Sequence, residues 1–279
     1  MRMSCWTPDI VRFMEDADRL SPYFGQLAAI AATHCPRGGR VLDAGCGMGQ
    51  LSLALAGHAG HVDAVDRSAD AIAHLTRRAR EEGIANVHAH CADMFSWARA
   101  HEPGYARRSW PARPRPARKA QDRPYDLAVF CLSASFEDAY AAACRMGARR
   151  VLVINKIHAQ SPYEPRPVVD DFDRALERNR CIDARARGMR VRLDYGQPLR
   201  SLEDAVTYFS LFRTRSYPQG VTPAQAEALI ERRDDQDFPY YLPVWRNLAV
   251  FACETDRQGA LLRGLGCDGL WDATETARR

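Results

Sequence analysis

The stretch VLDAGCGMGQ, residues 41–50, decides how this chain is expected to fold. It places Gly45, Gly47 and Gly49 between a short apolar run and the helix-like segment LSLALA. Glycine loses more conformational freedom on folding than any other residue, so three glycines in five positions need a reason. We therefore predict a tight turn between a strand and a helix, which a ligand approaches closely.

Short apolar runs alternate with helix-length segments on both sides of this turn. Strands are predicted at residues 40–44, 61–66, 86–91, 125–130 and 149–155, with a last buried strand at 247–254. Alternation of strand and helix is typical of parallel strands joined by right-handed crossovers. The pattern predicts a doubly wound α/β sheet, with the glycine turn at the carboxyl edge, where such sheets bind ligands.

Helical segments flank this core. Thr7-Pro8 and Ser21-Pro22 each place an N-cap residue before a proline, which predicts two leading helices. Beyond residue 155 we expect helices at 168–188, 201–213 and 222–233 and a strand at 189–196. The predicted organisation is a helical cap at 1–36, an α/β core at 37–156, and the end of the sheet with a helical lid insertion at 157–279.

The formal net charge of +4 is unevenly distributed. Segment 98–123 carries seven arginines and one lysine against two acidic residues, and its prolines alternate with arginine or alanine. This composition predicts a solvated basic insertion with extended backbone. A segment that contacts phosphates is the alternative.

Composition also bounds the cellular setting. The nine cysteines form no C-x-x-C pair, and no apolar run reaches the ~20 residues that span a bilayer. The N-terminus lacks the apolar stretch of a signal peptide, so reduced thiols and a cytoplasmic location are expected, with no membrane partner. His88 and His90 alternate on one strand face, but no third ligand accompanies them, so no metal is expected.

The spacing of the glycines distinguishes between nucleotide-like ligands. Dinucleotide-binding turns have the form G-x-G-x-x-G, whereas this chain has G-x-G-x-G with Gln50 in the later glycine position. No Gly-Lys-Ser/Thr follows, which excludes a P-loop. With Asp43 two residues before Gly45, the stretch resembles the D-x-G-x-G-x-G motif of class I S-adenosylmethionine (SAM)-dependent methyltransferases.

The resemblance implies SAM as cofactor, S-adenosylhomocysteine (SAH) as product, and a mostly parallel seven-stranded sheet. It also implies that Asp66 binds the ribose hydroxyls, Asp93 the adenine amino group, and Phe130 and Cys131 the methionine moiety. The full set of expected cofactor-binding residues is Asp43, Gly45, Cys46, Gly47, Gly49, Asp66, Arg67, Asp93, Met94, Phe130 and Cys131. Asp66 as a turn former and Asp93 as a helix N-cap are the structural alternatives.

The acceptor is judged from the segment after the fourth strand. There the chain has CLSASF, residues 131–136. Methyltransferases that act on base amines or glutamine amides resemble one another in an Asn/Asp-Pro-Pro-Tyr/Phe motif at this place, and this chain lacks that motif. No nucleic-acid-binding module is recognised, so no nucleic-acid partner is expected. The layout of leading helices and aromatic-rich C-terminal part resembles small-molecule methyltransferases, which transfer the methyl group to O, N, S or C.

Acceptor-side residues follow from that layout. His158, just past the fifth strand, is the candidate base. The leading helices and the C-terminal lid are expected to close the site from both sides, and the candidate substrate residues are Tyr23, Phe24, Ser133, Phe209 and Tyr241. Two alternatives stay open: a nucleic-acid or protein methyltransferase that docks through the basic insertion, and a scaffold subunit without chemistry.

Overall fold

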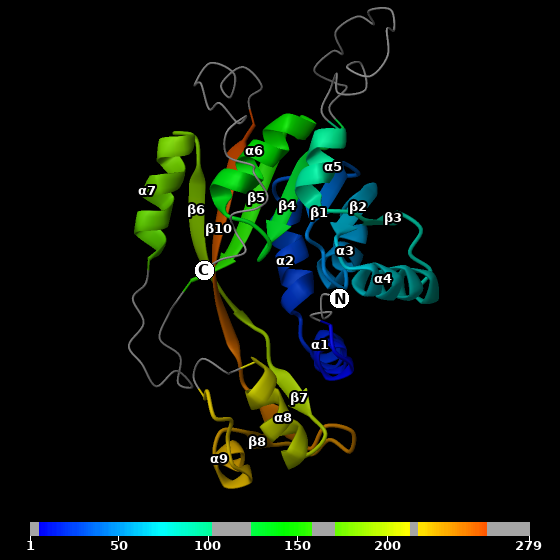
Figure 1. Ribbon diagram of the computed structural model, residues 1–279, viewed down its shortest axis with the longest axis vertical. Coiled ribbons are helices and arrows are strands. Elements are labelled where there is room, and N and C mark those ends of the chain that lie inside the picture. Colours follow the sequence, from blue (N-terminus) through cyan, green and yellow to red (C-terminus); the bar gives the residue numbers. More distant parts are fainter. Residues whose placement is uncertain (1–5, 102–123, 158–170, 213–216, 256–279) are drawn as a thin grey trace, which may run out of the picture.

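The computed structural model describes residues 6–101, 124–157, 171–212 and 217–255 (Figure 1). The described residues form a seven-stranded sheet in the order β3-β2-β1-β4-β5-β10-β6. Its strands are β1 (Arg40–Ala44), β2 (His61–Asp66), β3 (Val87–Cys91), β4 (Leu127–Cys131), β5 (Arg150–Lys156), β6 (Arg187–Asp194) and β10 (Trp245–Glu254). The first five are parallel, and β10 runs antiparallel to both neighbours.

The predicted doubly wound sheet is thus confirmed, and the predicted strands agree with the observed ones within two residues. The chain builds outward from β1 through β2 to β3, and then returns to place β4 on the other side of β1. This reversal puts the topological switch point between β1 and β4, where open α/β sheets bind ligands. The glycine turn follows β1 and lies at this point.

Helices cover both faces because the strands are apolar on both sides. In β1, Val41 packs toward α2 (Tyr23–Ala32) and α3 (Gln50–Ala56), while Leu42 packs toward α6 (Phe136–Met146). The first face also carries α4 (Ala69–Glu81), and the second carries α5 (Met94–Ala100) and α7 (Phe172–Ile182). None of the helices in the described part of the chain combines the length and hydropathy needed to span a bilayer.

A small domain is inserted between β6 and β10. It comprises β7 (Gln197–Leu199), α8 (Leu202–Phe212), α9 (Pro223–Glu227), β8 (Glu231–Arg232) and β9 (Tyr240–Leu242). The prediction of a helical insertion was therefore incomplete. Three short strands of the insertion form an antiparallel sheet in the order β7-β9-β8. The helix expected at 222–233 begins with the Thr222/Gln225 capping box but ends at Glu227, because Arg232 pairs with Tyr240 in this sheet.

The first helix, α1 (Pro8–Leu20), joins the small domain to the main body. Phe13 is fully buried and packs edge-on against Tyr208, with ring centroids 5.5 Å apart. The buried Asp16 carboxylate accepts a 2.6 Å hydrogen bond from Arg200, and Gln197 donates to the Phe13 carbonyl. The first helix and the insertion therefore pack together beyond the carboxyl edge of the sheet, while α2 packs on a face of the sheet (Figure 1).

Candidate active site

The glycine turn is tight, as its composition predicts. Gly45, Gly47 and Gly49 all adopt left-handed backbone, with φ of 76°, 55° and 82°. A Cβ atom on Gly45 would lie 2.5 Å from the Ser133 Cβ, so this position also lacks space for a side chain. The turn is held by backbone hydrogen bonds from the Gly45 and Cys46 amides to the Val65 carbonyl, at 2.7 and 3.1 Å.

The end of β2 holds the same turn through a carboxylate. Asp66 accepts hydrogen bonds from the Gly47 amide at 2.9 Å and from the Ser68 amide at 2.8 Å. Its side chain thus bridges the glycine turn and the start of α4. Arg67, which follows it, is exposed. Burial raises the pKa of the Cys46 thiol, so Cys46 stays protonated and fills space, as its small size suggests.

Asp43 lies beneath the turn and is 1% exposed. The Ser52 hydroxyl donates a 2.6 Å hydrogen bond to its carboxylate. Burial raises the pKa of Asp43 to about 6, the Ser52 hydrogen bond opposes the shift, and the negative charge of Asp66 adds to it. Asp43 is therefore a buried acidic group at the base of the site, and Asp66 is the acidic group at its surface.

The third strand ends at an exposed acidic residue. Asp93 caps α5, because its carboxylate accepts hydrogen bonds from the Phe95 and Ser96 amides at 3.2 and 2.9 Å. The N-cap interpretation of Asp93 is thus the one seen, and its contact with adenine stays a prediction. The Met94 sulfur lies beside the turn, 3.7 Å from the position of a Cβ on Gly45.

The segment after β4 lies against the turn. The Phe130 side chain is fully buried on one face of the sheet, while Cys131 packs on the opposite face. Ser133 donates a 2.7 Å hydrogen bond from its hydroxyl to the Ala44 carbonyl. This hydroxyl therefore holds the β4 loop against the end of β1, and its contact with substrate stays a prediction.

Comparison with known proteins accords with this geometry. Residues 41–104 match the family model described as a methyltransferase domain. This segment of the chain is therefore similar to a methyltransferase domain. The matched segment includes the glycine turn, Asp66 and Asp93, which are the residues that carried the resemblance.

Individual proteins are similar over different shares of the chain. The 23S rRNA (uracil(1939)-C(5))-methyltransferase RlmD of Methylococcus capsulatus is 49% identical over 65 residues, which cover 21% of this chain and 15% of that protein. The solved YcgJ protein from Bacillus subtilis aligns at 14% identity and a TM-score of 0.45, covering 84% of this chain and 98% of its own. Geranyl diphosphate C-methyltransferase from Streptomyces coelicolor A3(2) aligns at 17% identity and a TM-score of 0.43, covering 82% and 78%.

The fold brings some acceptor-side candidates together and separates others. Tyr23 is buried, with Phe24 half-buried beside it at a centroid distance of 5.0 Å. Phe209 is fully buried inside the small domain against Tyr208, and this position leaves no surface for substrate in this conformation. Tyr241 lies in β9, where Arg233 covers its ring. The candidate base His158 lies outside the described residues, as do residues 102–123 of the basic insertion.

Four site residues were missed by the sequence analysis. Leu132, directly after β4, has φ of 57° and is 48% exposed, while its amide donates to the Ile154 carbonyl at 2.8 Å. The Trp6 ring lies over the turn, since a Cβ on Gly47 would meet it at 3.1 Å. The others are Tyr195 and Arg246, which pack beside Tyr23. Only Leu132 breaks a backbone rule, because non-glycine residues seldom adopt positive φ.

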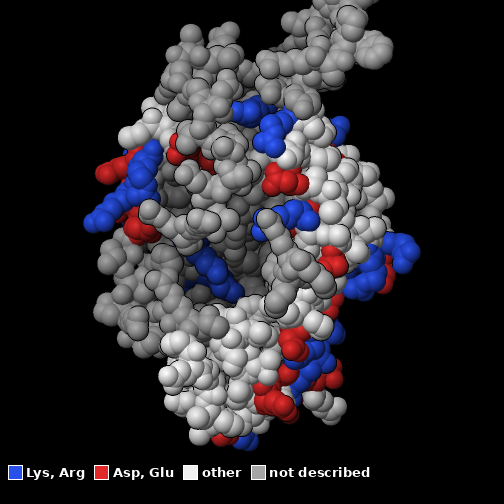
Figure 2. Space-filling model, in the orientation of Figure 1, with Lys and Arg blue, Asp and Glu red and all other residues white. Residues whose placement is uncertain are grey.

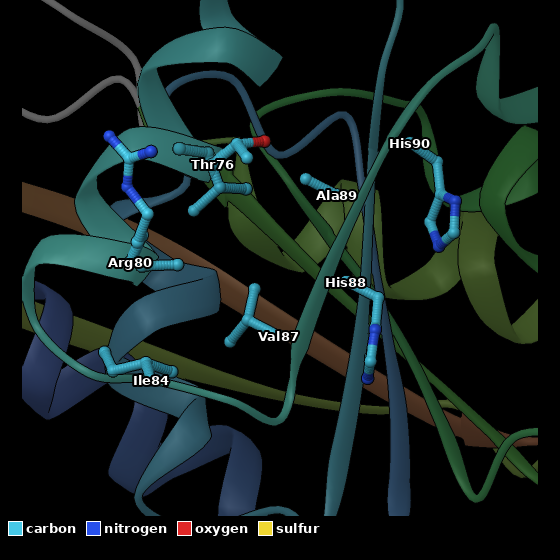
Figure 3. Close-up of a pocket in the computed structure, with 9 residues that line it drawn as sticks. Thr76, Arg80, Ile84, Val87, His88, Ala89 and His90 are labelled. Atoms are coloured by element: carbon cyan, nitrogen blue, oxygen red, sulfur yellow. The ribbon is translucent and has the colours of Figure 1, made fainter.

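The histidines of the third strand contact an acidic side chain and another histidine. His90 contacts Asp63 at 2.9 Å, and His88 stacks on His61 with ring centroids 4.4 Å apart. In the described ranges no three His, Cys, Asp or Glu side chains are grouped to hold a metal ion. A pocket lined in part by these two residues lies between α4 and the edge strand β3, and in Figure 3 both histidine side chains point away from Arg80 of α4. This pocket lies at the outer edge of the sheet, away from the β1–β4 switch point.

Proposed function

We propose that the protein transfers a methyl group from SAM to a small-molecule acceptor. The observation that supports a small acceptor is the continuous body of α1 and the small domain, which lies beyond the carboxyl edge and buries Tyr23 and Tyr195 there. A covered, largely apolar site suits a small molecule that is removed from water. A polymer would need an open approach to the end of β4.

The residues present fit the cofactor that this function needs. The glycine turn leaves its backbone uncovered by side chains of its own, and the Asp66 carboxylate lies directly at it. Asp66 would bind the ribose hydroxyls, Asp93 and Met94 would border the adenine, and the backbone of Phe130 and Cys131 would border the methionine moiety. When bound, SAM supplies the electrophilic methyl group for an in-line displacement by a nucleophile of the acceptor.

The protein groups near the end of β4 are suited to alignment and not to proton abstraction. Burial raises the pKa of the Cys131 thiol to about 12, and nearby Asp43 adds to the shift. Burial likewise raises the pKa of the Tyr23 phenol. Both groups stay protonated at neutral pH, so they orient the acceptor and exclude water. A base is needed only for a nucleophile that arrives protonated, and His158 is the residue that we propose for that role.

Methylation of a nucleic acid is the second candidate. It is favoured by the match to an rRNA methyltransferase over 65 residues and by the basic composition of segment 98–123. A scaffold without chemistry is disfavoured, because Asp43, the three glycines, Asp66 and Asp93 are all present.

Calorimetry followed by a transfer assay tests these alternatives. The full-length protein should bind SAM and SAH but not NAD, and Asp66→Ala serves as the impaired control. Labelled SAM is then incubated with a metabolite extract and, separately, with total RNA. Label in the low-molecular-weight fraction supports the proposal. Label in RNA that weakens steeply with salt favours the second candidate, and binding of NAD without SAM contradicts the cofactor assignment.

A further inference from the structure

Arg246 lies at the carboxyl edge of the sheet, next to the expected acceptor position. In the antiparallel pairing of β10 with β5, Leu248 lies opposite Lys156, the last residue of β5. Arg246 is two residues earlier in β10 and therefore extends past the end of β5. Because side chains alternate along a strand, Arg246 shares the face of Leu248, which packs with Tyr23 and with Cys131.

The Arg246 guanidinium lies over one ring of an aromatic pair. The guanidinium carbon lies 4.4 Å from the centroid of the Tyr195 ring, and Tyr195 in turn packs edge-on against Tyr23 at 5.3 Å. Burial raises the pKa of the Tyr23 phenol; the Cys131 thiol adds to this shift and the positive charge of Arg246 opposes it. Arg246 and Cys131, at the end of β4, therefore both influence the Tyr23 phenol.

Arg246 differs from other half-buried arginines in its charge balance. Arg12, Arg78 and Arg150 contact the carboxylates of Asp204, Glu82 and Glu254 at 2.8, 2.7 and 3.3 Å. Arg246 is also half-buried, yet it makes no ion pair with any Asp or Glu within the ranges that the structure describes. A partly desolvated cation without an anion gains most from a ligand that supplies one.

The chemistry of a guanidinium agrees with an anion site. Figure 2 shows one face of the molecule, where Lys and Arg side chains lie beside a hollow. A guanidinium presents a planar fork of donors that matches the two oxygens of a carboxylate or phosphate. We propose that Arg246 binds an anionic group, a carboxylate or a phosphate, on the methyl acceptor and so positions the acceptor beside Cys131. This inference rests on the small-molecule function proposed above.

The chain offers a matched control on the neighbouring strand. Arg192 of β6 lies over the Trp245 ring at 4.5 Å, much as Arg246 lies over Tyr195. Arg192 pairs with Asn247, so it points to the opposite face of the sheet, where it is exposed. Arg246→Gln and Arg192→Gln therefore remove the same charge from similar settings, but only the first changes the proposed site.

The test uses full-length protein and three probes, which are benzoate, phenyl phosphate and neutral benzyl alcohol. SAH affinity is measured first, and then each probe is titrated by calorimetry into protein saturated with SAH. Wild type should prefer one of the two anions to benzyl alcohol by about tenfold or more, as expected for a charge-assisted hydrogen bond. The anion that binds better identifies a carboxylate or a phosphate as the ligand group.

The variants decide the assignment. Arg246→Gln should lose the anion preference while its SAH affinity stays unchanged, Arg246→Lys should retain part of it, and Arg192→Gln should retain all of it. The inference is overturned if wild type prefers neither anion to benzyl alcohol. It is also overturned if Arg246→Gln keeps the anion preference, or if Arg192→Gln loses it. Because Arg246→Lys keeps the charge, it still tests the site if Arg246→Gln does not fold. Wild type that fails to bind SAH would instead contradict the proposed function.

Discussion

The Asp66 carboxylate accepts a hydrogen bond from the Gly47 amide at 2.9 Å, so the end of β2 fixes the turn that follows β1. One acidic side chain therefore has two tasks in the proposed function. It holds the backbone of the glycine turn, and it offers its remaining lone pairs to the cofactor ribose. Loss of the carboxylate should affect both.

Asp66→Ala should weaken SAM binding while the protein remains folded. A charged acceptor is lost to both the turn and the ribose, and hydrogen bonds to charged groups contribute about 1.5–3 kcal/mol, or roughly 10- to 150-fold in affinity. Calorimetric titration with SAM and SAH measures the change. Asp70→Ala, which removes an exposed acidic residue from the first turn of α4, should bind as wild type does. Equal affinities for the two variants would show that Asp66 does not contact the cofactor.

Gly45→Ala should destabilise the protein more than Gly83→Ala. Both glycines have left-handed backbone, with φ of 76° and 68°, but only the added Cβ at position 45 would meet Ser133 at 2.5 Å. At position 83 nothing lies within 4 Å, so that variant measures the backbone cost alone, about 1–2 kcal/mol. Urea unfolding gives both values. The double variant Gly45→Ala with Ser133→Gly should recover the part that is due to the clash, and no recovery would contradict this account.

The parts of the site that the sequence predicts are those at strand ends in the regular core. Asp43, Asp66, Asp93 and Cys131 each follow or end a short apolar run, and parallel strands bring such ends to one edge. The side-chain partners of these residues were less predictable. Asp93 illustrates this, because its two hydrogen bonds to α5 agree equally well with a helix cap and with a ligand residue that is not yet engaged.

Nothing in the sequence pattern marks Arg246 or Leu132 as a site residue. Arg246 lies over Tyr195 only because β10 inserts antiparallel between β5 and β6, a pairing between segments far apart in the chain. Leu132 is an ordinary residue type whose positive φ is set by the surrounding contacts. The small sheet was missed because β7, β8 and β9 have only two or three residues each, too few for a periodic pattern.

Arg200→Leu should destabilise the joint between α1 and the small domain. It leaves the Asp16 carboxylate, 3% exposed, without its 2.6 Å partner, and breaking a buried pair costs about 3–5 kcal/mol, an upper value here because the Arg200 side chain is half-exposed. Arg232→Leu is the control, since Arg232 and Glu227 form a 2.8 Å pair at the surface. Its removal should cost much less in urea unfolding, because an exposed ion pair contributes little to stability. Similar losses in both variants would show that α1 does not depend on the small domain.

The raised pKa of Asp43 predicts a pH-dependent stability. Since its pKa rises to about 6 in the folded protein and is about 4 in the unfolded chain, the folded state binds the proton more tightly. The free energy of unfolding should therefore fall as pH rises through this window, by about 3 kcal/mol from this group alone. Asp43→Asn keeps an acceptor for Ser52 and should remove that fall, while Asp70→Asn should not. Parallel unfolding curves of wild type and Asp43→Asn between pH 4 and 7 would contradict the assignment.

Leu132→Gly should separate stability from catalysis. The left-handed φ of 57° costs a leucine about 1–2 kcal/mol, and glycine removes that cost at an entropic penalty of about 0.5–1 kcal/mol. The leucine side chain is 48% exposed, so little packing is lost, and the unfolding free energy should change by less than about 1 kcal/mol. Methyl transfer should nevertheless fall, because Leu132 fixes the β4 loop between Cys131 and Ser133 and borders the crevice. The control is Leu132→Asn, because asparagine tolerates the same φ and restores a side chain. Leu211→Gly would not serve as a control, since glycine weakens a helix.

Calorimetry with SAH, urea unfolding and label transfer measure the separation in wild type, Leu132→Gly and Leu132→Asn. If Leu132→Gly transfers methyl groups at the wild-type rate, the strained leucine has no part in positioning the acceptor.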